Sequence, residues 1–259
     1  MVTNLFLKPG TVLRMAVFTL LLGRGWQFFL SGNPFHIWQQ NHPSASWIIT
    51  AIGLYCLAGA AMAWLVNPGK KLLYAIISGS SAILLLMTWV LWEGSRFEFA
   101  QLIEQTAQWA TPLLLLYFLS FHAGKSFSFP PERLMIIVSA LVFTGHGLYA
   151  SGIYAQPGHF HFMITRILGI SGAPASHFLH VAGVMDFIVS IGVFFPKVRR
   201  LCLMYMVIWG TLTALARVVA YTEVNDLAGT LILWLPQTVF RLPHGLLPLA
   251  ALRAQKSDL

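Results

Sequence analysis

The chain of 259 residues is 57% hydrophobic and only 9% charged, and its formal net charge is +8. A soluble domain carries about 25% charged residues, so the composition excludes a water-soluble surface and predicts one integral membrane domain over 1–259. The basic residues lie in short stretches between apolar segments, which the positive-inside rule explains without nucleic acid as a partner. The two cysteines, Cys56 and Cys202, stand alone in apolar runs, which excludes a CxxC redox pair and a thiolate zinc site.

The apolar segments predict an all-α, polytopic bundle of about eight membrane-spanning helices, because a spanning helix needs about 20 mostly apolar residues. The expected spans, in chain order, are 11–30, 46–66, 72–92, 102–121, 133–153, 175–195, 201–221 and 237–253. Pro236 comes just before the last one, and Pro243 and Pro248 lie inside it, so one kinked helix beginning at residue 227 is the alternative. The first run is expected to be retained, because Arg24 and Gln27 interrupt it and no signal-peptide cleavage site follows.

The distribution of lysines and arginines predicts the orientation. With eight crossings, most basic residues outside the spans fall on one side: Lys8, Lys70, Lys71, Lys125, Arg133, Lys197, Arg199, Arg200, Arg253 and Lys256. The opposite connections hold the acidic residues Glu93, Glu98, Glu223 and Asp226, together with Arg96 and Arg166. Because short Lys- and Arg-rich loops stay in the cytoplasm, both termini are expected to be cytoplasmic. The expected location is the cytoplasmic (inner) membrane of a bacterium.

Several ionisable side chains lie inside the expected spans, mostly in the half opposite the lysine-rich loops. Each costs about 2.5 to 3.5 kcal/mol near the centre of a spanning helix, so together they predict a polar cavity that opens to the periplasmic side. The candidate ligand-binding residues are Arg24, Glu104, His146, His177, His180, Asp186, Arg217, Arg241 and His244. The spacing of Gln101, Glu104, Gln108 and Thr111 predicts one continuous polar stripe on the fourth helix.

Three interpretations of these residues are open. In the first, buried ion pairs only fix how the helices pack, and Asp186 meets Arg24 or Arg217. In the second, histidines bind a metal ion or haem, with His159 and His161 as metal ligands, since imidazole suits iron, copper and zinc. In the third, arginine and histidine donors hold the polar head of a quinone or lipid, and Phe, Trp and Met side chains surround its ring or tail.

Short glycine-containing segments add a resemblance to a known family. They are Arg14 to Gln27, which ends in Leu-Leu-Gly-Arg-Gly-Trp-Gln; Thr144 to Tyr149 around His146; and Gly183 to Gly192, a Gly-x-x-acid-x5-Gly pattern around Asp186. These segments resemble the DoxX-like membrane proteins. The resemblance implies a four-helix unit, which this chain is long enough to contain twice, and a link to quinone-dependent sulfur oxidation that some members have. It supplies no catalytic residue.

The sequence therefore predicts an inner-membrane protein whose periplasmic-side cavity binds a quinone-like or lipidic small molecule, within an electron-transfer assembly. A quinone and a haem are the candidate cofactors. Membrane lipid and other membrane subunits are the expected partners. One alternative is a non-enzymatic transporter or a structural subunit of a larger membrane complex, and another is a membrane redox protein that carries haem or metal. Whether the chain is an enzyme stays open at this point.

Overall fold

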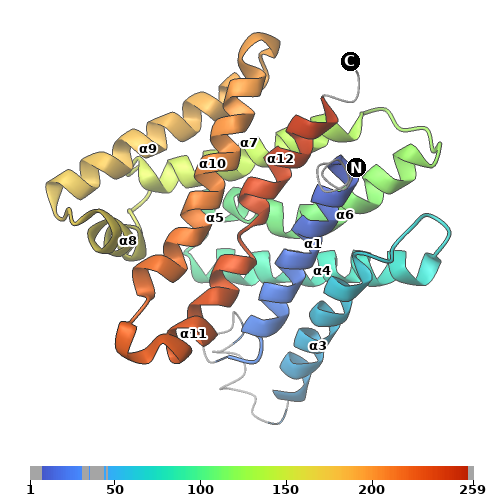
Figure 1. Ribbon diagram of the computed structural model, residues 1–259, viewed down its shortest axis with the longest axis horizontal. Helices are drawn as coiled ribbons and strands as arrows, with labels where there is room; N and C mark the ends of the chain where they lie inside the picture. Colours follow the sequence, from blue (N-terminus) through green and yellow to red (C-terminus); the bar gives the residue numbers. More distant parts are fainter. Residues whose placement is uncertain (1–7, 31–34, 36–43, 45, 256–259) are drawn as a thin grey trace.

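The computed structural model describes residues 8–30, 35, 44 and 46–255, and this part of the chain is helical and contains no strand (Figure 1). The α-helices are α1 Pro9–Gln27, α3 Ser46–Met62, α4 Lys71–Gly94, α5 Phe99–Glu104, α6 Thr106–His122, α7 Pro131–Ala150, α8 Gly158–Leu168, α9 Ala173–Gly192, α10 Pro196–Tyr221, α11 Leu227–Val239 and α12 Pro243–Ala254. A short 3-10 helix, η3 Val224–Asp226, precedes α11.

Four of the described helices, α4, α7, α9 and α10, are long and apolar enough to cross a membrane, and α3 is a shorter apolar helix. The predicted all-helical class is thereby confirmed over the described residues, and the four long apolar helices are consistent with the predicted membrane protein. Prolines begin several of these helices, at Pro131 in α7 and Pro196 in α10 for example. A proline has no backbone N–H to donate, and the first turn of a helix has no acceptor for one, so proline fits there without loss.

Helices α1 and α12 lie side by side at the centre of the bundle (Figure 1). Helices α9 and α10 lie on one side of this pair and α3 lies on the other, while α4 and α7 pass behind it (Figure 1). The core between them is apolar and includes Leu13, Leu20, Met206 and Leu247, each almost fully buried. On the outside, α9 and α10 expose large apolar side chains such as Ile191, as expected of helices that face lipid.

The structure differs from the prediction at the fourth segment, where one helix was expected over 102–121. It contains two helices, α5 and α6, which meet at Gln105. The hydroxyl of Thr106 donates a hydrogen bond of 3.3 Å to the carbonyl of Leu102, and the amide of Gln108 bonds to the carbonyl of Gln105 at 2.9 Å. A side-chain donor and a three-residue turn thus replace regular helical bonding. The predicted polar stripe is therefore divided between two helices.

The C-terminal segment also differs from the predicted boundaries. Helix α11 runs from Leu227 through Pro236 to Val239, and the chain then bends before α12 begins at Pro243. Pro243 has no N–H to donate to the carbonyl of Val239, so a regular helix cannot continue through it. Backbone hydrogen bonds between residues three apart form at the bend. The amide of Arg241 donates to the carbonyl of Thr238 at 3.0 Å, and the amide of His244 donates to the carbonyl of Arg241 at 2.9 Å.

Helix α8 lies in a stretch where a loop had been predicted. Gly158–Leu168 is strongly amphipathic, and Gly169 ends it with a φ of 72°. Glycine adopts this left-handed conformation without the steric cost that other residues meet. The helix packs against α9 and α10 and thereby covers the side of the bundle on which the candidate site lies.

Candidate functional site

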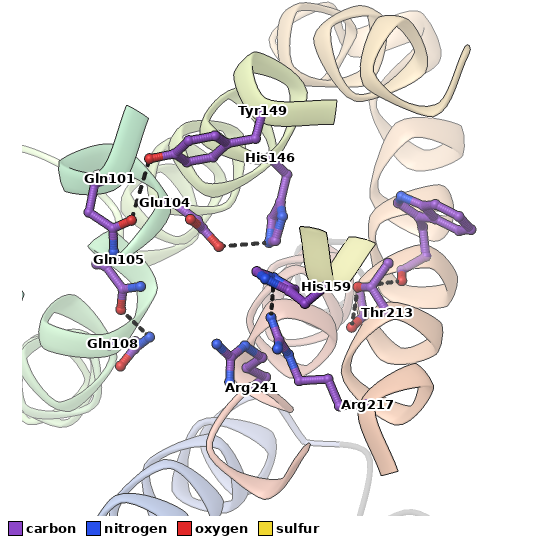
Figure 2. Close-up of polar contacts among 12 residues, drawn as sticks. Gln101, Glu104, Gln105, Gln108, His146, Tyr149, His159, Thr213, Arg217 and Arg241 are labelled. Atoms are coloured by element: carbon purple, nitrogen blue, oxygen red, sulfur yellow. Dashed lines mark hydrogen bonds and ion pairs between the residues drawn. The ribbon is translucent and has the colours of Figure 1, made fainter. Parts of the chain in front are cut away.

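Ionisable side chains from separate helices meet in the interior of the protein. We call this group the polar cluster. It consists of Arg24 on α1, Glu104 at the end of α5, His146 on α7, His159 on α8, Arg217 on α10, Arg241 in the bend between α11 and α12, and His244 on α12. Figure 2 shows the cluster members that it labels turned toward one another from their different helices.

A glycine contact places Glu104 beside His146. Gly145 packs against α5 so closely that a Cβ added to it would lie 2.6 Å from the backbone nitrogen of Glu104. Only a glycine permits this approach of the two backbones. As a result the carboxylate Oε1 of Glu104 lies 3.9 Å from Nε2 of His146 (Figure 2). This distance is longer than a hydrogen bond.

Arg24 is held by amides and by an aromatic ring. Its Nε donates to Oε1 of Gln108 at 2.9 Å, its Nη1 donates to Oε1 of Gln27 at 2.6 Å, and its Nη2 also bonds to Gln108. The guanidinium carbon lies 3.6 Å from the ring centre of Phe240, and that of Arg241 lies 4.3 Å from the same ring centre. Phe240, which is 1% exposed, therefore makes cation–π contacts with both guanidinium groups.

Arg241 lies where helical bonding is interrupted between α11 and α12. Its Nη1 donates to the backbone carbonyl and to the side-chain oxygen of Gln237, both at 3.1 Å. Arg241 also lies within electrostatic reach of Arg217, Arg24 and Glu104. The bend thus brings a third guanidinium group into the cluster.

Arg217 connects the cluster to α8. Its Nη2 lies 3.2 Å from Nε2 of His159 (Figure 2). Burial lowers the pKa of His159 to about 3, and the neighbouring Arg217 and Arg241 act in the same direction. The ring is therefore neutral at neutral pH, and its Nε2 can accept the proton that the guanidinium donates. Arg217 and His159 together attach α8 to α10.

Two histidines of the cluster have ring nitrogens without partners. The rings of His146 and His244 are 5.3 Å apart and nearly perpendicular. Close packing of α10 against α12 sets the backbone position of His244, since a Cβ added to Gly210 would lie 2.5 Å from the carbonyl oxygen of His244. The Nε2 atoms of both histidines are buried and make no hydrogen bond in the described part of the chain. Such atoms call for a partner.

A cavity of about 460 Å³ extends from this cluster, a size within the usual range of about 300 to 1,000 Å³ for small-molecule sites. His146, Arg217, Arg241 and His244 line its polar end. The remaining wall is mostly apolar and comes from α7, α8, α9 and α10, with Phe160, Met163, Phe178, Leu179, Trp209 and Leu212 among its side chains. Several of the lining residues, namely Ile167, Leu168, Leu212, Leu215 and Val219, are also exposed on the outside of the protein.

The predicted site residues do not all lie in this place. The structure brings together Arg24, Glu104, His146, Arg217, Arg241 and His244. His177 and His180 are exposed on α9 and lie outside the cluster. The ring of His180 lies against the turn after α7, since a Cβ added to Gly152 would be 3.5 Å from its Cε1.

Asp186 lines the cavity but has other partners than expected. The hydroxyl of Tyr205 lies 3.5 Å from its Oδ1, and Trp209 lines the same cavity. Arg24 and Arg217 instead bond to Gln108 and His159. The expected pairing of Asp186 with either arginine is therefore wrong. Tyr205 and Trp209 are on α10, which packs against α9, and sequence spacing alone cannot say which residues two helices bring together.

The two predicted metal ligands point to different partners. His159 contacts Arg217, while Nε2 of His161 lies 2.8 Å from the side-chain oxygen of Gln156. Within the described ranges, no three His, Cys, Asp or Glu side chains are grouped so that they could hold a metal ion. The cysteines Cys56 and Cys202 are free and buried.

Comparison with known proteins gives no assignment. No family model matches the chain, and neither a curated protein nor a solved structure resembles it. The functional argument therefore depends on the cluster and its cavity.

Proposed function

We propose that this protein binds an amphipathic small molecule, quinone-like or lipidic, in the cavity between α7, α8, α9, α10 and α12. The polar head lies against the arginines and histidines of the polar cluster, and the apolar ring or tail lies along α8, α9 and α10. A quinone is the ligand class that the resemblance to DoxX-like proteins implies, and with it a role within an electron-transfer assembly.

One observation carries the proposal, namely that the cavity has two chemically different ends. Arg217, Arg241 and His244 offer hydrogen-bond donors at the polar end. Ile167 and Leu215 belong to the apolar end and also face outward. In a membrane protein, exposed apolar side chains face lipid, so a ligand can enter sideways from the bilayer with its head first.

The ligand test compares variants that fill the cavity with variants that do not. Ala216→Trp places a large side chain in the cavity wall on α10, and Ala58→Trp places the same side chain on the exposed surface of α3. Wild-type protein and the Ala58→Trp control are expected to copurify with a stoichiometric lipophilic molecule, detected by mass spectrometry of an organic extract. Ala216→Trp should lose it. Equal ligand content in all three proteins, or none in any, contradicts the proposal.

Transport of the ligand is a second candidate, favoured by the break between α11 and α12. Discontinuous helices with charged groups at the break are typical of transporter binding sites, and Arg241 lies at this break. Movement of a lipophilic tracer between the leaflets of proteoliposomes, faster than in protein-free vesicles, separates this candidate from binding alone. An unchanged rate excludes transport of that tracer.

We further propose that α1, α3, the pair α5–α6 and the pair α11–α12 complete a set of eight crossings with both termini in the cytoplasm. In support, α1 starts and α12 ends at the same end of the bundle (Figure 1). The guanidinium of Arg14 bonds to the carbonyls of Ala63 at 2.6 Å and Val66 at 2.7 Å, so a basic residue also lies at the end of α3.

The topology is tested by labelling single cysteines in a variant that lacks both native ones. Asn225→Cys, between α10 and α11, is expected on the periplasmic side and should react with a membrane-impermeant maleimide in intact cells. Ser126→Cys, between α6 and α7, should react only after lysis. The reverse pattern would overturn the orientation, and labelling of both positions in intact cells would overturn the number of crossings.

A further inference from the structure

We propose that the head group of the ligand is anionic, a phosphate or a carboxylate, bound between Arg217, Arg241 and the two histidines of the polar cluster, His146 and His244, whose Nε2 atoms make no hydrogen bond among the described residues. This inference rests on the proposed function, because it names the chemical class of the molecule that the cavity holds.

The first argument is charge. The cluster contains the guanidinium groups of Arg24, Arg217 and Arg241, and among the described residues its one carboxylate is Glu104. Even if Asp186 on the cavity wall is counted as ionised, three positive charges face two negative ones. An uncompensated charge inside a protein costs several kcal/mol. An anion in the polar end of the cavity removes that cost.

The second argument is hydrogen bonding. A guanidinium has five N–H groups, and Arg217 uses one nitrogen, Nη2, toward His159. Its remaining N–H groups make no hydrogen bond within the described ranges, and Arg217 lines the cavity. The buried Nε2 atoms of His146 and His244 likewise make no hydrogen bond in the described part of the chain, and the carboxylate nearest to His146 is 3.9 Å away. Phosphate and carboxylate oxygens accept bonds from such forked and clustered donors, with charge assistance.

A neutral quinone satisfies these groups less completely. Its carbonyl oxygens accept hydrogen bonds but carry no net charge, so the excess positive charge of the cluster remains. A free inorganic anion satisfies the charge but leaves the long apolar wall, including Phe160, Met163 and Leu212, without a ligand. An acidic amphiphile satisfies both ends of the cavity.

The test uses pairs of probes that share their apolar chains and differ in the head group. The delipidated full-length protein in a neutral detergent is titrated with dioleoyl phosphatidic acid or dioleoylglycerol, and with oleate or oleyl alcohol. In a separate experiment, the protein is titrated with inorganic phosphate alone. Binding is followed by native mass spectrometry and by the shift in Tm. The acidic member of at least one pair is expected to bind at least about tenfold more tightly than its neutral partner, a difference of about 1.4 kcal/mol.

Two matched variants locate the effect. Arg217→Gln removes a guanidinium from the cavity and should abolish the preference for the acidic probe. Arg166→Gln removes a guanidinium from the exposed surface of α8, where it bonds to Glu223 at 3.2 Å, and should leave the preference unchanged. If Arg217→Gln does not fold, Arg217→Lys keeps the charge without the fork, and the acidic preference should be reduced but present.

Each outcome decides between the two proposals. Equal binding of acidic and neutral partners overturns the anionic head group and leaves the amphiphile site intact. The same preference in Arg217→Gln as in wild type also overturns it, because the anion then binds elsewhere. Phosphate alone binding as tightly as phosphatidic acid overturns the lipid source. Absence of binding by any probe, together with Ala216→Trp indistinguishable from wild type in ligand content, means that the proposed function itself fails.

Discussion

Replacing Phe240 by leucine should destabilise the protein more than the loss of packing explains. The ring lies 3.6 Å from the guanidinium carbon of Arg24 and 4.3 Å from that of Arg241. A cation–π contact contributes about 2 kcal/mol when it is desolvated and about 0.5 to 1 kcal/mol when exposed. Two buried contacts therefore contribute roughly 2 to 4 kcal/mol. The variant also removes the ring that contacts both positively charged guanidinium groups, those of Arg24 and Arg241.

A matched variant separates this contribution from packing. Phe143→Leu replaces a ring that is 2% exposed and has no cation above it, so it loses the same atoms in a similarly buried place. In thermal unfolding followed by circular dichroism, 1 kcal/mol shifts Tm by roughly 2 to 4 °C in a protein of about this size. Phe240→Leu should therefore unfold at least about 4 °C below Phe143→Leu. Equal Tm values would show that the guanidinium contacts of Phe240 add no net stability.

Further variants test the packing and hydrogen bonds around the cluster. Gly23→Ala should cost about 1 to 3 kcal/mol, because its Cβ would lie 2.5 Å from the backbone of α11–α12, whereas Gly94→Ala, with open space around it, should leave Tm unchanged. Gln108→Leu removes the acceptor of two charged hydrogen bonds and should cost about 2 to 4 kcal/mol in chemical unfolding. Folding lowers the pKa of His159 to about 3, so below about pH 6.5 the unfolded chain takes up a proton on this ring before the folded protein does. The free energy of unfolding therefore falls as the pH decreases from about 6.5 toward 3. His159→Gln should therefore flatten the fall in Tm between about pH 6.5 and 4.

The positions of most of the helices follow from hydrophobicity, because long apolar runs in a chain with few charges have no stable alternative to spanning helices. The same argument makes buried charges gather, since a charge that faces lipid is costly. This argument predicts a common site for Arg24, His146, Arg217 and His244, and the structure brings them together. That they bind a ligand stays a prediction.

Other features depend on which helix faces turn toward each other. His177 and His180 were selected by the same rule as His146, yet they are exposed on α9. Asp186 bonds to Tyr205, because the rotation of α9 against α10 determines its neighbours. Sequence spacing within one helix carries no information on that rotation.

Helix α8 is a different case, because its sequence contains a pattern that predicts a helix. Phe160, Met163, Ile164, Ile167 and Leu168 recur at spacings of three and four residues, the pattern of an amphipathic helix. Polar residues such as His161 and Arg166 interrupt the run, so the segment does not have the continuous hydrophobicity of a membrane-spanning helix. His159 was consequently interpreted as a metal ligand, whereas it contacts Arg217.

The outward-facing apolar rim of the cavity, with Ile167, Leu215 and Val219, has a consequence for specificity. A tail that moves from the bilayer into this cavity exchanges one hydrocarbon environment for another, so it gains almost no hydrophobic free energy. Chain length should then matter little in a bilayer, and discrimination among membrane components depends on the few polar atoms at the inner end. Under the proposed function, the protein therefore distinguishes lipids that carry similar chains by their head groups.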